Sequence, residues 1–390
     1  MAKMKNKSKL VSMVVIMAII FTTISPIGIS RADNWYEDEP GFFTLFDEEG
    51  NELTTMASEM FKEDEYISSD NKHYSISRVD KKGKRAHAKF LGEIQLPEFE
   101  EIDDMSMEAI APKEGDRSIL LYCTHSDESY VPSDGKPSIP AEGGIYDVAE
   151  SFKNSLEKKG IKVVLDKTSH DPHDAGAYRR SRQTAMDLIR KNMPIAAVFD
   201  LHRDATPKHT YETSVDGEYM SKVRIVIGKR NQNRKVNEEL AYKIKAIADK
   251  SHPGLIKDIY IGRGEYNQEL SPRSLLFEFG THEISKEAAQ KATVNMADVV
   301  NKAIFGGVFK SKEHDKGQEE KGETKETRET KERSYKAEPI SQEEGKGAGS
   351  GILWFIIIAA IGIVVFTLIS KSRNEMADSF NNIFGKKKRE

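Results

Sequence analysis

The middle of the chain alternates short apolar runs with longer segments in which apolar residues recur every three or four positions. The apolar runs predict buried strands, and the amphipathic segments predict helices. The predicted strands are 119–123, 161–165, 195–201, 223–227 and 275–280. The predicted helices are 145–159, 178–192, 236–250 and 285–303. Strands that alternate with helices favour an α/β fold with a mostly parallel sheet flanked by helices, which we expect to occupy residues 117–305.

The region before this domain has a different pattern. Residues 33–100 are polar, with short alternating pieces such as 74–79 and 86–91, and predict a small β-rich region. Segment 101–116 is acidic and lacks periodicity, so we interpret it as a linker. Segment 306–350 is composed mainly of Lys, Glu, Thr, Gly and Ser, which predicts a disordered charged tether.

Both ends of the chain carry apolar segments flanked by positive charge. Residues 1–32 contain four lysines, an apolar stretch and small residues before Asp33, which predicts a signal peptide or, alternatively, an uncleaved amino-terminal anchor. Residues 351–370 are uncharged and apolar and predict a transmembrane helix, followed by a basic tail at 371–390. Because positive charge favours the cytoplasmic side, we expect a membrane protein whose main domain is extracytoplasmic.

Composition adds three limits. Only 38% of the 390 residues are hydrophobic, so part of the chain cannot belong to a packed core. The net charge of -4 gives no indication of nucleic-acid binding, and we expect none. Cys123 is the single cysteine, which excludes an intramolecular disulfide.

Two of the predicted strands are followed by a histidine. His125 comes after strand 119–123 with Glu128 three positions later, and His202 comes after strand 195–201. The carboxyl ends of parallel strands meet at one edge of a sheet, where ligands gather. Imidazole and carboxylate groups bind zinc, and a hydrolytic zinc site uses three of them and leaves one position to water. We therefore predict that His125, Glu128 and His202 hold Zn²⁺, with Glu142 as the alternative to Glu128.

Glu278 interrupts an otherwise apolar strand. Burial of an unpaired carboxylate is unfavourable, so this residue is a candidate general base and acid next to a metal-bound water. The alternative is a structural ion pair with Arg182 or Arg203. We also expect Arg182, Arg203 and Asn267 to contact substrate.

Two further polar groups leave alternatives open. His170 and His173 stand in the polar segment 169–174, where a solvated loop is the default and contact with a substrate or ligand is the alternative. Asp204 either orients the His202 imidazole or pairs with Arg203.

Several spaced blocks together resemble the stage II sporulation protein P family of endospore-forming bacteria. They include THSDESY at 124–130, GGIYDVA at 143–149, KKGIKVVLDKTSHDPHDAGAYRRSR at 158–182, FDLHRDA at 199–205 and YNQELSPRSLLFEFGTHEISKEAA at 266–289. The resemblance covers residues 119 to about 303, and the family usually has a histidine where this chain has Cys123.

The resemblance implies a zinc N-acetylmuramoyl-L-alanine amidase-like cell-wall hydrolase with a zinc amidase (phosphorylase/hydrolase-like) fold. By position, the family's metal-site histidines fall on His125 and His202, its acidic motif residue on Glu128, and its catalytic glutamate on Glu278. It further implies peptidoglycan as substrate, endopeptidase activity on cross-linked stems, a role in sporulation, and a lytic transglycosylase of the stage II sporulation protein D type as partner. A stem-peptide peptidase or carboxypeptidase, or a catalytically silent wall-binding scaffold, is the alternative.

Overall fold

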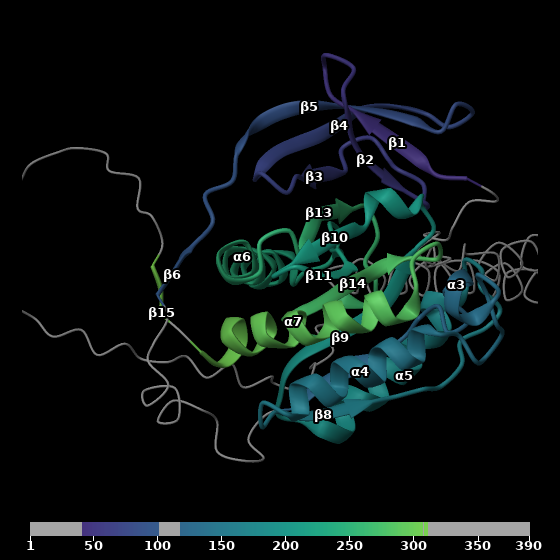
Figure 1. Ribbon diagram of the computed structural model, residues 1–390, viewed down its shortest axis with the longest axis vertical. Helices are drawn as coiled ribbons and strands as arrows, with labels where there is room; N and C mark the ends of the chain where they lie inside the picture. Colours follow the sequence, from purple (N-terminus) through teal and green to yellow (C-terminus); the bar gives the residue numbers. More distant parts are fainter. Residues whose placement is uncertain (1–40, 101–117, 307, 311–390) are drawn as a thin grey trace, which may run out of the picture. The chain divides into compact units, whose positions relative to one another are not determined.

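One sheet of eleven strands runs through the computed structural model (Figure 1), which describes residues 41–100, 118–306 and 308–310. The strand order is β2-β1-β5-β4-β3-β13-β12-β14-β9-β7-β8. The strands from the amino-terminal region are β1 (Phe43–Phe46), β2 (Glu52–Met56), β3 (Glu65–Ile67), β4 (Lys72–Asp80) and β5 (Arg85–Glu93). The others are β7 (Ser118–Tyr122), β8 (Lys162–Leu165), β9 (Ile195–Asp204), β12 (Val223–Gly228), β13 (Ile256–Gly262) and β14 (Ser274–Thr281).

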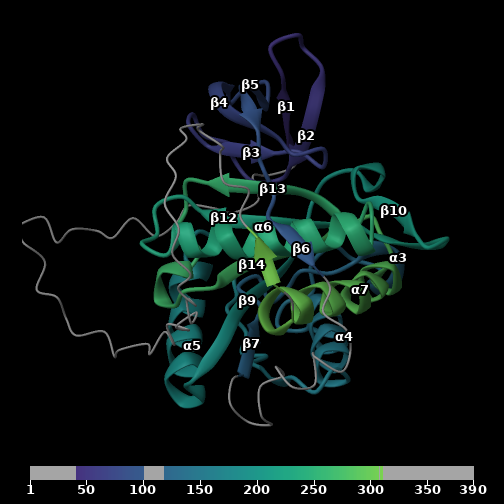
Figure 2. The same cartoon turned by 90° about the vertical axis from the view of Figure 1, so that its left-hand side faces the viewer.

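Helices cover the central strands, and Figure 2 shows them from a second side. They are α3 (Val131–Asp134), α4 (Ile145–Glu157), α5 (Ala177–Asn192), α6 (Arg234–Ser251) and α7 (Lys286–Phe305), with 3-10 turns η1 (Lys208–Thr210) and η2 (Gln268–Leu270). Two small sheets pair β10 (Glu212–Val215) with β11 (Glu218–Ser221) and β6 (Glu98–Glu100) with β15 (Val308–Lys310). Ser285 caps α7, and its hydroxyl accepts a hydrogen bond from the Ala288 N–H.

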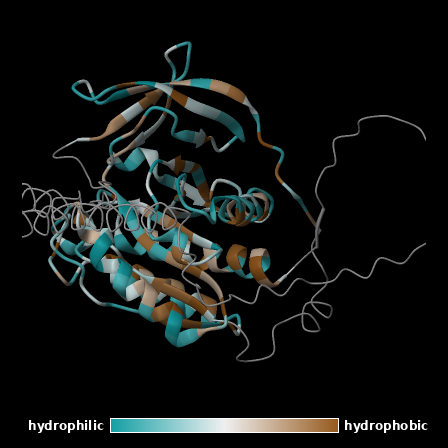
Figure 3. Cartoon of the chain, turned by 180° about the vertical axis from the view of Figure 1, so that it is seen from behind, coloured by the Kyte–Doolittle hydropathy of each residue, from teal (hydrophilic) through white to brown (hydrophobic). Residues whose placement is uncertain are grey.

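The apolar residues of the helices and strands meet in one large core. Phe199, Phe277 and Phe279 point to the same side of the sheet and pack with Phe152 of α4. Figure 3 shows apolar residues concentrated on the central strands and in stripes along the helices. Helix α5 packs with Leu120, Tyr122 and Val198 on the other side, where Leu188 contacts them. The strands are therefore buried on both faces.

The predicted mostly parallel sheet is wrong, because the sheet is mixed. The pairs β13–β12, β14–β9, β9–β7 and β7–β8 are parallel, but β12–β14 and β3–β13 are antiparallel. The sequence prediction missed β13 and treated α6 as the connection between β12 and β14. The helix instead leads from β12 to its parallel neighbour β13, and the chain then returns through η2 without a crossover helix. Such a return produces an antiparallel strand.

The β-rich region before residue 101 also continues the main sheet. Its strand β3 pairs antiparallel with β13, with Tyr66 opposite Tyr260. The predicted pieces 74–79 and 86–91 lie within β4 and β5. A second cluster of buried residues, including Met60 and Tyr74 from this region and Tyr178 and Tyr266 from the rest, covers the face of the sheet opposite the large core.

The fold-class prediction also contained a carboxyl-terminal transmembrane helix. Within the described ranges, none of the helices combines the length and apolar composition needed to cross a membrane. The predicted segments 1–32, 101–116 and 351–370 lie outside the described residues, as do 371–390 and nearly all of 306–350.

Candidate metal and catalytic site

The turn after β7 is fixed by a carboxylate on the neighbouring strand. Asp200 of β9 accepts hydrogen bonds from the Thr124 backbone N–H at 2.8 Å and from the Thr124 hydroxyl at 2.6 Å. β7 and β9 are parallel neighbours, with Tyr122 opposite Asp200. The residues that follow Thr124 therefore emerge beside β9, where His202 lies within the strand rather than beyond its end.

Two of the predicted ligands, His125 and His202, approach one oxygen atom of the third, Glu128. Glu128 Oε1 lies 3.0 Å from His125 Nδ1 and 3.2 Å from His202 Nδ1. All three side chains are almost completely buried. Zinc–ligand bonds of about 2.0–2.1 Å in a tetrahedral site put neighbouring ligand atoms about 3.3 Å apart. The two distances to Glu128 and the chemistry of the donors therefore suit a zinc ion.

The other oxygen of Glu128 is held in place by the backbone. Its Oε2 accepts a hydrogen bond of 2.8 Å from the Arg203 N–H. The Arg203 guanidinium is buried and donates to the carbonyl oxygens of Ser129 and Pro137. Arg203 therefore fixes both Glu128 and the loop that follows it, a structural role that differs from the predicted contact with substrate.

His202 lies between two carboxylates. Its Nε2 is 3.0 Å from Asp200 Oδ1, and its Nδ1 faces Glu128. Burial disfavours the charged imidazole, but Asp200 and Glu128 outweigh that effect and hold the pKa of His202 well above its usual range. The carboxylate on the Nε2 side of His202 is therefore Asp200, and the partners of the Asp204 side chain include Arg224 and Tyr211.

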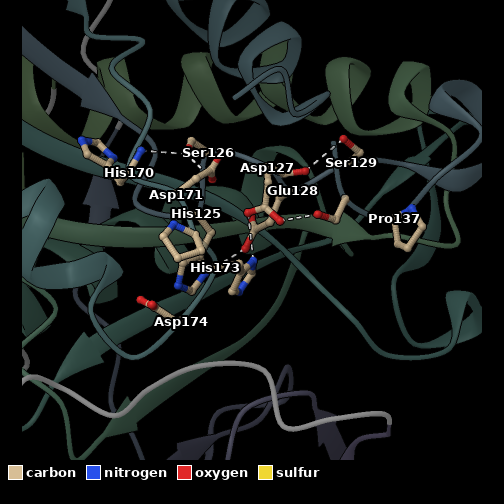
Figure 4. Close-up of polar contacts among 12 residues, drawn as sticks. His125, Ser126, Asp127, Glu128, Ser129, Pro137, His170, Asp171, His173 and Asp174 are labelled. Atoms are coloured by element: carbon tan, nitrogen blue, oxygen red, sulfur yellow. Dashed lines mark hydrogen bonds and ion pairs between the residues drawn. The ribbon is translucent and has the colours of Figure 1, made fainter. Parts of the chain in front are cut away.

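A third histidine, His173, joins the site, although a solvated loop was the default expectation for its segment. The His173 ring stacks on the His125 ring with their centroids 3.9 Å apart, and its Nδ1 lies 3.0 Å from Asp127 Oδ1 (Figure 4). His125, Glu128 and His173 form a group whose ligand atoms all lie within 4.8 Å of one another. Burial and the neighbouring His173 lower the pKa of His125 to about 4, so its imidazole is neutral and able to bind a metal.

Glu278 occupies the position beside His202 on the next strand. The two residues are paired in register across β14 and β9. The Glu278 side chain is buried, and its Oε2 makes no hydrogen bond within the described part of the chain. Burial raises the pKa of this carboxyl well above its usual range, against the opposing charge of His202. The predicted ion pair with Arg182 or Arg203 is absent from the described contacts of Glu278.

The remaining predicted residues lie outside this group. Arg182 is partly exposed and pairs with Glu269. Asn267 is buried and donates hydrogen bonds to the Tyr178 carbonyl and the Ser181 hydroxyl, which attaches its turn to α5. Glu142, the alternative to Glu128, is exposed and does not belong to the group of potential ligands.

The donors lie next to an open cleft. The cleft has a volume of about 480 Å³ and is lined by Asp127, Ser138, Pro140, Asp171, Pro172 and His173. Asp171 connects the two loops that form it, because it accepts hydrogen bonds from the Ser126 hydroxyl and the Ala141 N–H. A substrate could therefore approach the donors past His173.

The sequence signals for Asp200, Asp127 and His173 are weak. Asp200 is two residues before His202 on the same strand, so alternation would place both side chains on one face. Asp127 directly precedes Glu128, and His173 is in a loop remote in sequence. His170, in the same loop, instead has a structural role, since its two nitrogens contact the Cys123 carbonyl and the Thr184 hydroxyl.

Comparison with known proteins places these residues in a family. The model of the stage II sporulation protein P family matches residues 36–301. Stage II sporulation protein P of Bacillus subtilis (strain 168) is 28% identical over 209 residues, which is 49% of this chain and 52% of that protein. This chain therefore matches only about half the length of that relative.

Two solved structures are also similar. One is the N-acetylmuramyl-L-alanine amidase Ami1 from Mycobacterium smegmatis, with 13% identity, a TM-score of 0.32, and coverage of 50% of this chain and 98% of that one. The other is the CwlD amidase from Clostridioides difficile in complex with the GerS lipoprotein, with 15% identity, a TM-score of 0.32, and coverage of 48% and 96%. At these low TM-scores the two structures define neither the fold nor the activity of this chain. The family match is the decisive one, and the chain belongs to the stage II sporulation protein P family.

Proposed function

We propose that this protein is a zinc-dependent peptidoglycan hydrolase that cleaves the amide bond between N-acetylmuramic acid and the L-alanine of the stem peptide. Its substrate lies outside the cell membrane, and we place the catalytic domain there. Family membership supports a role in cell-wall hydrolysis during sporulation. The observation that carries the zinc chemistry is the approach of two imidazoles, one from the turn after β7 and one from β9, to one buried oxygen of Glu128.

We assign the zinc ligands to His125, Glu128 and His202. Asp200 holds the Nε2 side of His202, which leaves Nδ1 for the metal, and the Arg203 N–H holds Glu128 Oε2, which leaves Oε1. His173 is the alternative third ligand, because Asp127 holds its Nδ1 in the same manner. In our assignment His173 instead stands at the cleft, between solvent and His125.

The side chains around the donors suit amide hydrolysis. A zinc ion held there would polarise the scissile carbonyl and make a bound water more acidic. Glu278, beside His202, would take a proton from the water and return it to the leaving amine. Burial raises the pKa of Glu278, which makes its carboxylate a stronger proton acceptor than an exposed glutamate. The buried surroundings exclude other water molecules that would weaken these interactions.

The reaction can be tested by the masses of the products. The full chain, loaded with zinc, is incubated with purified peptidoglycan, and the soluble products are analysed by mass spectrometry. We expect intact stem peptides with a free amino group on L-alanine. Fragments cut inside the stem would indicate the peptidase alternative, and the absence of products from well-folded, zinc-loaded protein would contradict both activities.

His202→Ala provides the matched control for this experiment. The substitution removes one of the three proposed ligands, so we expect loss of zinc from the purified protein and loss of product release. The partner that the family resemblance implies, a lytic transglycosylase of the stage II sporulation protein D type, stays a prediction and is not needed for the assay. Undiminished product release by the His202 variant would contradict the assigned site.

A further inference from the structure

Four charged or ionisable side chains form a row across four neighbouring strands. His202 of β9 is in register with Glu278 of β14, Glu278 with Arg224 of β12, and Arg224 with Asp258 of β13. Residues paired in register point to the same face of a sheet, with Cβ atoms about 5 Å apart. The row therefore connects the proposed metal site, through Glu278 and Arg224, to Asp258 of β13 along one face of the sheet.

Arg224 is the centre of this row. Its side chain is completely buried. Its Nε and Nη2 donate to the two carboxylate oxygens of Asp258 at 2.6 and 3.0 Å, and its Nη1 donates to Asp204 Oδ2 at 2.9 Å. Such a bidentate pair fixes the orientation of the guanidinium. Arg224 therefore holds a rigid positive charge next to Glu278.

The amino-terminal region supplies the remaining acceptors. Arg224 Nη2 also donates to the Thr54 hydroxyl at 2.7 Å and to the Thr55 carbonyl at 2.9 Å, both on β2. The backbone N–H of Ala57, just after β2, donates to Asp204 Oδ1 at 3.0 Å. Strand β2 lies at one edge of the sheet, but its carboxyl-terminal end contacts Arg224 and Asp204.

The hydroxyl of Thr54 contacts three charged groups at once. It accepts from Arg224 and from Lys257 Nζ at 2.9 Å, and it donates to Asp258 Oδ2 at 2.9 Å. All of these groups are buried. Removal of one partner from a buried charge leaves that charge undersatisfied, so the remaining groups shift to recover contacts.

We propose that Thr54 is a positioning residue for the proposed hydrolase: through Arg224 it fixes the place of Glu278 relative to the metal site. This inference rests on the proposed function, and it makes the amino-terminal region a part of the catalytic apparatus. Thr54 touches no reacting atom in this scheme. Its effect is on the geometry of the proton-transfer step and not on zinc binding or substrate binding.

The chain offers a matched control at the next residue. Thr55 is also buried, but its hydroxyl makes no hydrogen bond within the described residues. Thr54→Val and Thr55→Val therefore remove the same atoms from adjacent buried positions of one strand. Thr54→Ser keeps the hydroxyl and serves as the conservative variant. Each variant is made in the full chain and assayed for zinc content, thermal unfolding, kcat and KM on peptidoglycan fragments.

We expect Thr54→Val to lower kcat by about 10- to 100-fold, the effect of a small misplacement of a catalytic group, with KM and zinc content unchanged. Thr54→Ser and Thr55→Val should retain most of the wild-type kcat. Wild-type kcat in Thr54→Val, or equal losses in Thr54→Val and Thr55→Val, would overturn the inference while leaving the proposed function intact. If the zinc-loaded wild type hydrolyses nothing, the proposed function fails and this inference fails with it. Should Thr54→Val not fold, Thr54→Ala takes its place, because it also removes the hydroxyl: a loss of kcat at unchanged zinc content that Thr54→Ser does not share decides in favour, and wild-type kcat in Thr54→Ala decides against.

Discussion

The two faces of strands β9, β12 and β14 are both buried, but their chemistry is opposite. On one face, Phe277 lies 4.7 Å from Phe199 and 6.4 Å from Phe152, measured between ring centroids. On the other face, Glu278 lies between His202 and Arg224. Neighbouring residues of one strand therefore belong to an apolar core and to a charged site.

This difference separates stability from chemistry within a single strand. Burial of the aromatic face contributes favourably to folding, at roughly 25 cal/mol per Å² of apolar surface. Burial of the charged face is unfavourable unless each charge has a partner, and here the partners come from β2, the turn after β7 and β13. A substitution on the aromatic face should mainly change the free energy of unfolding, whereas one on the charged face should mainly change zinc affinity or turnover.

The largest effect on turnover without an effect on stability is expected at Glu278. Glu278→Gln keeps the shape of the side chain but cannot accept a proton, so we expect kcat to fall by about 10²–10⁴-fold. Zinc content should be retained, because Glu278 is not among the proposed ligands. The unfolding temperature should not fall, because Glu278 Oε2 makes no hydrogen bond within the described residues that the substitution would remove.

These three quantities are measured on one preparation by metal analysis, steady-state kinetics and calorimetry. Loss of zinc together with kcat would show that Glu278 binds the metal. A lowered unfolding temperature with normal kcat would show instead that the charged face serves stability, which is the reverse of the proposed division.

A smaller effect is expected at Asp200, which orients His202. We expect Asp200→Asn to weaken zinc binding by about 10–100-fold at high pH, as for other groups that hold a metal-binding histidine. Competition with a chelator of known affinity measures this change. Asp127→Asn is the matched control, because Asp127 holds His173 in the same way. A larger effect in the Asp127 variant would identify His173 as the ligand in place of His202.

The pH dependence of the Asp200 variant sharpens this test. Because the pKa of His202 is raised, its imidazole keeps a proton below that pKa, and zinc binding must displace it. Zinc affinity should therefore fall with decreasing pH, by about tenfold per pH unit for one proton. Without the Asp200 charge the pKa of His202 is lower, so the zinc affinity of the Asp200 variant begins to decline at a lower pH than that of the wild type. The difference in affinity between wild type and variant should narrow as pH falls.

Local pattern was sufficient to predict most helices and strands of the main domain, but it failed for β13. That strand contains Lys257 and Asp258 side by side, so it lacks an uninterrupted apolar run. Both residues are buried because their partners, Thr54 and Arg224, come from strands far away in the sequence. A pattern that measures hydrophobicity along the chain does not register such pairs. The mixed order of the sheet was missed as a direct consequence.

The same limit applies to the site. His125, Glu128 and His202 could be selected because each stands at or near the end of an apolar run, and the structure brings them together. Glu278 could be selected because it breaks such a run. Asp200, Asp127 and His173 could not be assigned, since their roles depend on which histidine each carboxylate meets. Arg203 was predicted to contact substrate, and in the structure its guanidinium donates to the carbonyls of Ser129 and Pro137 in the loop after Glu128.

The smallest effect on chemistry is expected at Phe277, one residue from Glu278 but on the aromatic face. Its ring is fully buried among Phe152, Phe199 and Phe279. Phe277→Leu should lower the free energy of unfolding by about 1–3 kcal/mol, because the smaller side chain leaves a partly filled space. Denaturant titration measures this loss. Zinc content and kcat should stay at wild-type values, since the apolar substitution leaves every contact of the charged face in place. A fall in kcat comparable to that of Glu278→Gln, at little cost in stability, would mean that the aromatic face controls the position of Glu278 and that the two faces act as one.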